Sequence, residues 1–361
     1  MKLVVVIGSV LGLMSSANIS AQEASDSDFV IAVPETVELA FIIAALSELD
    51  RENGAQINRR SDYFADIAAH FEPYMDLPAI ADLPPALNLP RFAGNAADYA
   101  FNESGGLVEV DDSGSLWRDS DGDRFRAMLG ELESFAMTSG FREFYRSRES
   151  LYSANIDATR QMVDPEDMTG WLVAEFSARE APIRIYVSPL TGGLNWTTLY
   201  KPEQRMWLQA PDADNVAQST VLDRMRFARS VFTELDHSYV NPVSAGMVDE
   251  VNAAFSDATV WASQQAISQY PTAELQFNEY MTWAVFLLYA ADRLDAADYE
   301  TLRPEVVNVM ENRRGFRAFG AFTHALAERR ADTGQRLEDL FPAMLDWSAT
   351  WQANYVRPTK N

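Results

Sequence analysis

The chain has 361 residues and a formal net charge of −24, and it contains no cysteine. The lack of cysteine excludes disulfides, thiolate zinc sites and cysteine nucleophiles, so any metal would have to be bound by His, Asp or Glu. The negative charge argues against nucleic acid and against an anionic membrane surface as partners, because both attract a basic face.

The first residues have the pattern of a signal peptide. Lys2 is followed by an apolar run over 3–14 and then by small and polar residues that end at Ala21. The run is too short for the roughly 20 apolar residues of a membrane-spanning helix, and no later stretch reaches that length. We therefore expect a signal peptide over 1–21, a periplasmic or secreted protein without a membrane span, and a flexible leader over 22–28.

The segment 29–165 is predicted to be a mainly helical N-terminal region. Apolar residues recur at helical spacing from Pro34 to Leu49, from Ser61 to Phe71 and again over 123–152. Five prolines over 73–90 make a sustained helix or a central strand unfavourable there. We expect this proline-rich stretch to be an extended connection.

The segment 166–361 is predicted to contain a small antiparallel sheet followed by helices. Apolar residues alternate with Arg184 and Tyr186 over 183–187, turn residues occupy Ser188–Gly193, and a strand pattern resumes over 194–200. This pattern predicts a β-hairpin, with a third short strand over 205–208. Helical patterns follow over 220–240, 247–269, 272–294, 297–313, 315–330 and 337–355. The predicted fold class is α+β, mainly helical.

The helical pattern over 220–240 contains the residues that could bind a metal or take part in catalysis. A helix places residues three and four apart on one face, so four polar side chains meet there: Thr233, Glu234, His237 and Asn241. Zincin metallopeptidases use this spacing in the motif His-Glu-x-x-His, in which two histidines bind zinc and the glutamate activates water. Here Glu234 and His237 are in register, and Thr233 replaces the first histidine.

A second acidic residue lies in the next long apolar helix. Glu279 follows Asn278 inside the helical pattern over 272–294. In gluzincins the third zinc ligand is a glutamate on the helix that follows the motif helix, and Glu279 falls at that place. Glu279 could instead be a buried carboxylate that pairs with an arginine or caps a helix. An acid in so apolar a run needs a partner, and a metal or His237 would also serve.

These residues resemble a bacterial secreted family catalogued as domain of unknown function 4932, whose members usually carry a His-Glu-x-x-His-Ser-x-x-Asn-Pro pattern. The resemblance extends to Val33–Leu39 near the start and to Ser188–Gly193 in the predicted hairpin. It implies a gluzincin-like fold, in which a small antiparallel sheet packs against the motif helix and the glutamate helix that follows it.

The resemblance also implies roles for individual residues. Glu234 would be the general base and His237 and Glu279 would bind zinc, whereas Thr233 departs from the family pattern. Three nearby residues would support the metal ligands: Asp236, Asn241 and Asn278.

Three functions fit these residues. The first is a zinc-dependent hydrolase acting on a peptide or protein substrate, in which Asp236, His70 or water takes the place of the missing ligand; His324 is a further candidate. The second is a catalytically inactive pseudopeptidase that binds a peptide or an envelope partner. The third is a helical structural protein, in which His237 and Glu279 are ordinary polar groups of the core.

Overall fold

The computed structural model describes residues 29–49, 56–84, 87–110, 120–177, 182–193, 195–200 and 203–355. The predicted signal peptide and leader, residues 1–28, lie outside this part of the chain. The described chain is mainly helical with a small sheet, which confirms the predicted α+β class at that level. None of its helices is both long and apolar enough to cross a membrane.

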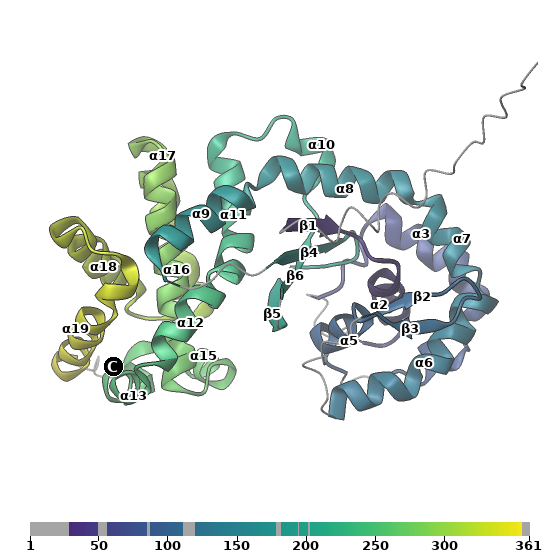
Figure 1. Ribbon diagram of the computed structural model, residues 1–361, viewed down its shortest axis with the longest axis horizontal. Coiled ribbons are helices and arrows are strands. Elements are labelled where there is room, and N and C mark those ends of the chain that lie inside the picture. The colour runs from purple at the N-terminus through teal and green to yellow at the C-terminus, as the bar shows by residue number, and fades with distance from the viewer. Residues whose placement is uncertain are drawn as a thin grey trace, which may run out of the picture.

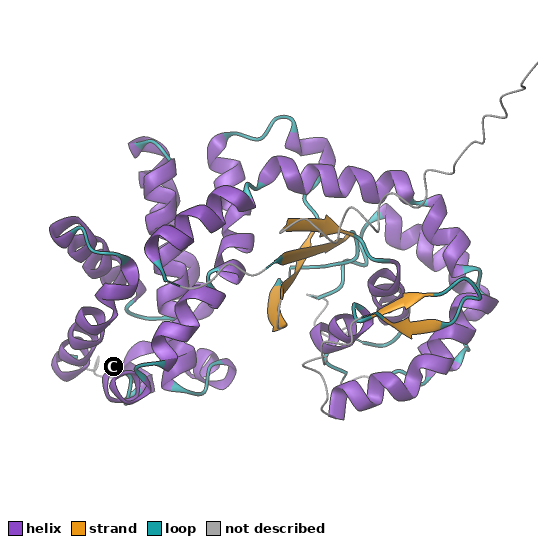
Figure 2. Ribbon diagram, in the orientation of Figure 1, coloured by secondary structure: helices purple, strands orange, loops and turns teal. Residues whose placement is uncertain are grey.

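The first half of the chain folds mainly into helices, with a two-stranded antiparallel sheet formed by β2 and β3 (Figures 1 and 2). Its elements are β1 (Phe29–Ala32), α2 (Glu35–Leu46), α3 (Asp62–Phe71), η3 (Glu72–Tyr74), α4 (Pro78–Ala81), α5 (Leu89–Ala96), β2 (Tyr99–Phe101), β3 (Leu107–Glu109), α6 (Ser120–Thr138), α7 (Phe141–Ser147) and α8 (Glu149–Met162).

Two expectations for this half need correction. The predicted helix over 123–152 is three helices. Gly140 has a left-handed conformation (φ 66°) that separates α6 from α7, and Arg148, with non-helical dihedral angles (φ −106°, ψ 10°), separates α7 from α8. The proline-rich stretch is also not simply extended. Pro78 is the first residue of α4 and Pro90 the second residue of α5, and in the first turn of a helix the missing N–H of proline costs no hydrogen bond.

A four-stranded mixed sheet lies at the centre of the molecule (Figure 2). Besides β1 it contains β4 (Ile183–Ser188), β5 (Trp196–Tyr200) and β6 (Glu203–Gln209), in the order β1-β4-β6-β5. Strands β1, β4 and β6 are parallel, and only β5 runs antiparallel to its neighbour β6.

The predicted hairpin between 183–187 and 194–200 is therefore wrong, and the sheet is not purely antiparallel. The loop after β4 does not fold back on that strand, because its hydrogen bonds go to another segment. Gly192 N donates to Gln56 O at 2.8 Å, and Asn58 N donates to Leu190 O at 2.7 Å. Strand β4 is thus free to pair with β1 on one side and β6 on the other, and the hairpin is β5–β6.

The second half of the chain forms the helical group on the other side of the sheet (Figure 1). Its helices are α9 (Pro165–Glu175), α10 (Ala213–Val216), α11 (Val221–Leu235), α12 (His237–Ala245), α13 (Val248–Ala254), α14 (Ala258–Trp261), α15 (Gln264–Gln269), α16 (Ala273–Arg293), α17 (Ala296–Asn308), the π-helical turn η4 (Val309–Arg314), α18 (Phe319–Thr333), η5 (Leu337–Leu340) and α19 (Phe341–Asn354). Most predicted helices appear at their places, some divided into shorter ones.

Helix α11 connects the sheet to the helical group. It contacts β5 and β6 on one side and α16 on the other. Phe232 of α11 stacks on Tyr289 of α16 with ring centroids 4.6 Å apart, and both α11 and α16 bury apolar side chains along this contact. The predicted packing of the motif helix against both the sheet and the following helix is therefore present.

Candidate functional site

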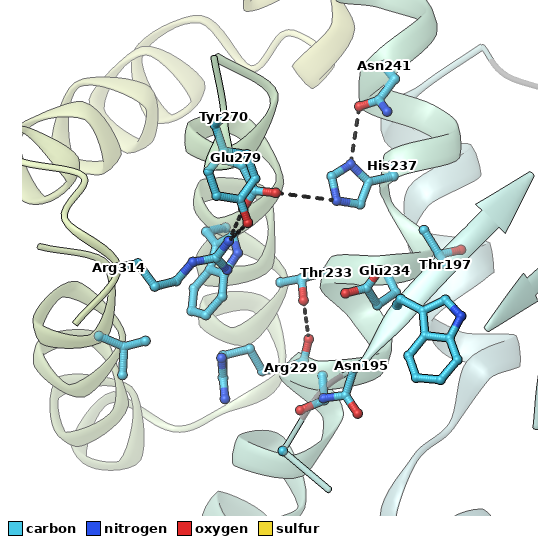
Figure 3. A pocket seen from close by; sticks show the side chains of 15 residues that line it. Asn195, Thr197, Arg229, Thr233, Glu234, His237, Asn241, Tyr270, Glu279 and Arg314 are labelled. Carbon is cyan, nitrogen blue, oxygen red and sulfur yellow. Dashed lines mark hydrogen bonds and ion pairs between the residues drawn. The ribbon is translucent and has the colours of Figure 1, made fainter. Parts of the chain in front are cut away.

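A cavity of about 690 Å3 opens between α11, α16, β5 and η4 (Figure 3). Its lining combines charged, polar and aromatic side chains. They are Gly193, Asn195, Trp196, Thr197, Arg229, Ser230, Thr233, Glu234, His237, Asn241, Tyr270, Glu279, Trp283, Val309 and Arg314. The cavity thus brings together four sequence-predicted site residues, Thr233, Glu234, His237 and Glu279, with Asn241.

Helix α11 sets the spacing of the motif residues. A capping box at Thr220 fixes its start, where the Thr220 hydroxyl and the Asp223 carboxylate satisfy each other's backbone N–H groups. The helix ends at Leu235, and Asp236 joins it to α12 with dihedral angles close to helical values (φ −71°, ψ −14°). His237 therefore stays one turn beyond Thr233 although the predicted single helix is two helices.

The hydroxyl of Thr233 is used by its own helix. It donates to the backbone oxygen of Arg229 at 2.9 Å, and the residue is only 6% exposed. Such back-bonding to the residue four positions earlier is common for threonine inside a helix. The oxygen at the position of the missing histidine is thus already hydrogen-bonded.

His237 is held between two neighbours. Its Nδ1 lies 3.3 Å from Asn241 Oδ1, one turn further along α12. When Nδ1 carries the proton and donates to Asn241, Nε2 presents its lone pair to Glu279. The distance from Nε2 to Glu279 Oε1 is 3.9 Å, which is longer than a hydrogen bond but close to the roughly 3.4 Å between two ligands of a tetrahedral zinc ion.

Glu279 pairs with an arginine whose identity the sequence did not indicate. Arg314 Nη2 donates to Glu279 Oε2 at 2.6 Å and also to the hydroxyl of Tyr270. Of the partners expected for this buried acid, which were a metal, His237 or an arginine, the closest is an arginine: the guanidinium comes from η4, and Trp283 lies against it at 4.7 Å. No local pattern links Arg314 or Tyr270 to Glu279, because the three lie on separate elements.

The backbone at the end of η4 requires a glycine, and this glycine fixes the position from which the Arg314 side chain extends. Gly315 has φ +83°, in the left-handed region, and a Cβ at this position would lie 2.1 Å from Ser263 Oγ. Ser263 N in turn donates to Gly315 O at 2.8 Å. The close approach of these two segments therefore fixes the end of η4, and with it the origin of the Arg314 side chain.

Glu234 faces the sheet. Burial raises the pKa of its carboxyl, and so does the negative charge of Glu279, whereas His237 and the backbone N–H of Thr197 on β5 lower it. The backbone oxygen of Glu234 accepts from Gln204 Nε2 of β6 at 2.8 Å. The motif helix and the sheet are thus joined at the residue predicted to be the general base.

Other predicted residues lie outside the cavity lining. Asp236 is fully buried, its carboxylate has no hydrogen-bond partner among the described residues, and burial raises its pKa well above the ordinary value. Asn278 accepts from the Ser244 hydroxyl at 2.6 Å, on α12. His70 contacts the backbone oxygen of Ser139, and His324 faces Glu328 on the exposed side of α18.

The residues as they stand do not fit a three-ligand zinc site. His237 and Glu279 offer two donors, but the third position holds a hydroxyl, which is a weak ligand and is bonded to its own helix. In the part of the chain that the structure describes, no group of three His, Cys, Asp or Glu side chains is arranged to hold a metal. The guanidinium of Arg314 also occupies one oxygen of Glu279.

Comparison with known proteins gives no match: no family model, no curated protein and no solved structure is similar to this chain. The resemblance to domain of unknown function 4932 therefore stays a prediction, based on the residues quoted for it above. The cavity itself is the basis for a functional assignment.

Proposed function

We propose that the protein is an exported, peptidase-like binding protein that holds an extended peptide in the cavity, beside a zinc motif that no longer forms a complete ligand set. The observation that carries the proposal is the position of β5. This strand is at one end of the sheet order, so no strand of the described chain pairs with its outer edge, and Asn195, Trp196 and Thr197 line the cavity beside α11.

An unpaired strand edge next to a cavity is suited to an extended peptide. The backbone of such a peptide would pair with β5 as an added strand, and its alternate side chains would enter the cavity. Trp196 supports this edge from within, because it stacks on Trp207 of β6 with ring centroids 5.4 Å apart and planes 8° apart. The edge is therefore held in a fixed position relative to α11.

The contacts of Thr233 and Glu279 favour binding over zinc-dependent hydrolysis. The Thr233 hydroxyl is bonded within α11, and Arg314 supplies the positive charge beside Glu279. Because the Thr233 hydroxyl and the Glu279 carboxylate both have partners within the protein, neither needs a metal ion to be stable there. On this proposal the cleft corresponds to a peptidase site that lacks one of its zinc ligands.

A zinc-dependent hydrolase is the second candidate, and one observation favours it. His237 Nε2 and Glu279 Oε1 are 3.9 Å apart, and the partly buried Glu234 has a raised pKa beside them. A general base with a raised pKa works nearer to neutral pH. The two candidates differ in their response to zinc, for which a test is given in the Discussion.

The binding proposal is tested with a randomised library of N-acetyl pentapeptides and the immobilised exported protein. Ser230 lines the cavity, so Ser230→Trp fills part of it, while Ser268→Trp places the same side chain on the exposed side of α15 as a control. We expect Ser230→Trp to lower peptide retention at least about tenfold and Ser268→Trp to leave it unchanged, with equal helix content in all three proteins. Equal retention by all three, or none by the unaltered protein, would contradict the proposal.

A further inference from the structure

Arg229 is a cation in the cavity that the motif does not explain. It stands on α11 one turn before Thr233, lines the cavity and is only partly exposed. Its guanidinium lies 4.7 Å from the ring centroid of Trp283 on α16. Burial lowers the pKa of Arg229, and the positive charge of Arg314 lowers it further. Arginine nevertheless stays protonated at neutral pH, so the charge is present in the cavity.

The charge of Arg229 is not balanced by the protein around it. Among the described residues, no carboxylate and no carbonyl oxygen accepts a hydrogen bond from its guanidinium, and no ion pair includes it. Arg314 lies at the same distance from Trp283, but it is paired with Glu279. Stacking on an aromatic ring satisfies the face of a guanidinium and leaves its N–H donors unused.

Other donors lie along the same part of the lining. The Oδ1 of Asn195 accepts from the backbone N–H of Gln209 at 3.1 Å, so the donor end of this amide, Nδ2, is left for a ligand. The hydroxyl of Ser230 follows Arg229 on α11 and also lines the cavity. Figure 3 shows Asn195 and Arg229 toward one end of the view and His237 with Glu279 toward the other.

The distribution of charge in the cavity favours a ligand that places a negatively charged group beside Arg229. A partly buried cation without a counter-charge is costly, and an anion that binds there recovers both the Coulomb energy and the unused hydrogen bonds. A planar carboxylate matches the two-pronged donor geometry of a guanidinium. Toward the other end, Glu279 would repel the same carboxylate, so the ligand is oriented with its acid toward Arg229.

We propose that Arg229, with Asn195 and Ser230 as further donors, binds a carboxylate of the peptide that occupies the cavity. The inference rests on the proposed peptide-binding function and adds the chemical class of the ligand. The carboxylate belongs either to the C-terminus of the peptide or to an Asp or Glu side chain, and both present the same group to the guanidinium.

Three peptide libraries distinguish these sources. All are N-acetyl pentapeptides whose randomised positions contain neither Asp nor Glu: one has a free C-terminal carboxylate, one has a C-terminal amide, and one has the amide with a single Glu fixed at the centre. Retention is measured on the unaltered protein, on Arg229→Gln, on Arg229→Lys and on Arg224→Gln. Arg224 is an exposed arginine of the same helix outside the cavity lining and serves as the matched control.

We expect the unaltered protein to retain one of the two acidic libraries at least about tenfold more than the amide library. Arg229→Gln should abolish this preference without removing the remaining retention, Arg229→Lys should restore part of it, and Arg224→Gln should change nothing. The preferred acidic library identifies the source of the carboxylate. Because a charge-assisted contact is screened by salt, the preference should also fall as ionic strength rises.

The outcomes separate this inference from the binding proposal. Equal retention of all three libraries, unchanged by Arg229→Gln, overturns the carboxylate inference and leaves peptide binding in place. No retention of any library overturns both. Should Arg229→Gln fold poorly, Asn195→Ala removes a donor outside the helical core, and an unchanged preference in both Asn195→Ala and Arg229→Lys would overturn the inference.

Discussion

Arg314 and Glu279 form an ion pair inside the cavity, with Nη2 2.6 Å from Oε2. The carboxylate uses its other oxygen, Oε1, to face His237 at 3.9 Å. A guanidinium thus supplies positive charge beside the acid that was predicted to bind a metal. The pair links η4 to α16 and gives the acid a counter-charge from within the protein.

The first prediction concerns the stability that this pair provides. Arg314→Gln would leave the largely buried carboxylate of Glu279 without its charged partner, and we expect the free energy of unfolding to fall by about 2 kcal/mol. The matched control is Arg226→Gln, which breaks a pair with Glu305 whose side chains are 39% and 45% exposed. That change should cost less than about 1 kcal/mol. Urea unfolding of both variants measures the difference, and equal losses would contradict it.

The second prediction concerns the missing zinc ligand. Thr233→His would place an imidazole on the face that carries His237, one turn earlier, and complete a set of three with Glu279. We expect zinc affinity to rise at least about tenfold, on the order of 1.4 kcal/mol. Adding Arg314→Gln should raise it again, because Glu279 then loses the competing guanidinium. Zinc titration by calorimetry measures both steps.

Two further variants control this zinc experiment. Glu279→Ala in the Thr233→His background should remove the gain, because only two donors remain. Arg224→His adds a histidine to the same helix outside the cavity and should leave the affinity unchanged. If the native protein and Thr233→His, both folded, bind zinc equally, the gluzincin-like geometry is wrong and His237 is an ordinary helical histidine. Tight zinc binding by the native protein would favour the hydrolase.

The third prediction concerns a buried acid far from the cavity. Glu38 on α2 is fully buried and accepts from the Tyr63 hydroxyl at 2.8 Å, and burial raises its pKa from 4.5 to about 7. Between these two values the folded protein binds more protons than the unfolded chain, so this group lowers stability as pH rises through the window. Glutamine keeps the acceptor for Tyr63 and carries no charge.

Glu38→Gln should therefore become more stable relative to the native protein as pH rises. Between about pH 5.5 and about pH 8.5 we expect a relative gain of about 2 kcal/mol, measured by urea unfolding at each pH. Glu131→Gln, an exposed change on α6, serves as the control and should show no such gain. A difference between Glu38→Gln and the native protein that does not vary with pH would show that Glu38 ionises normally.

The fourth prediction concerns export. The apolar run over 3–14 has the length and the flanking residues of a signal peptide, so the exported protein should begin at or near Gln22. Intact-mass measurement of the protein recovered from a bacterial periplasm or medium tests this. A mass that still includes Met1 or Lys2 would contradict cleavage.

Local sequence patterns predicted helices well, because the start and end of a helix depend mostly on the residues of that helix. Helix α3 begins at Asp62 with Ser61 as its cap, and α16 runs from Ala273 to Arg293, both close to the expected bounds. The hairpin prediction failed because alternation identifies a strand but not its partner. Strand β4 pairs with β1, which lies far away in the sequence, and that pairing depends on the whole sheet.

The sequence by itself determined that Thr233, Glu234 and His237 share a helical face, because their spacing follows from the geometry of any α-helix. It also determined that an acid would be buried on the following helix, since Glu279 stands in an apolar run. Only the tertiary structure decided what that acid contacts. Arg314 and Arg229 reach the cavity from separate helical segments, and the packing of those segments around Trp283 leaves one cation paired and the other available to a ligand.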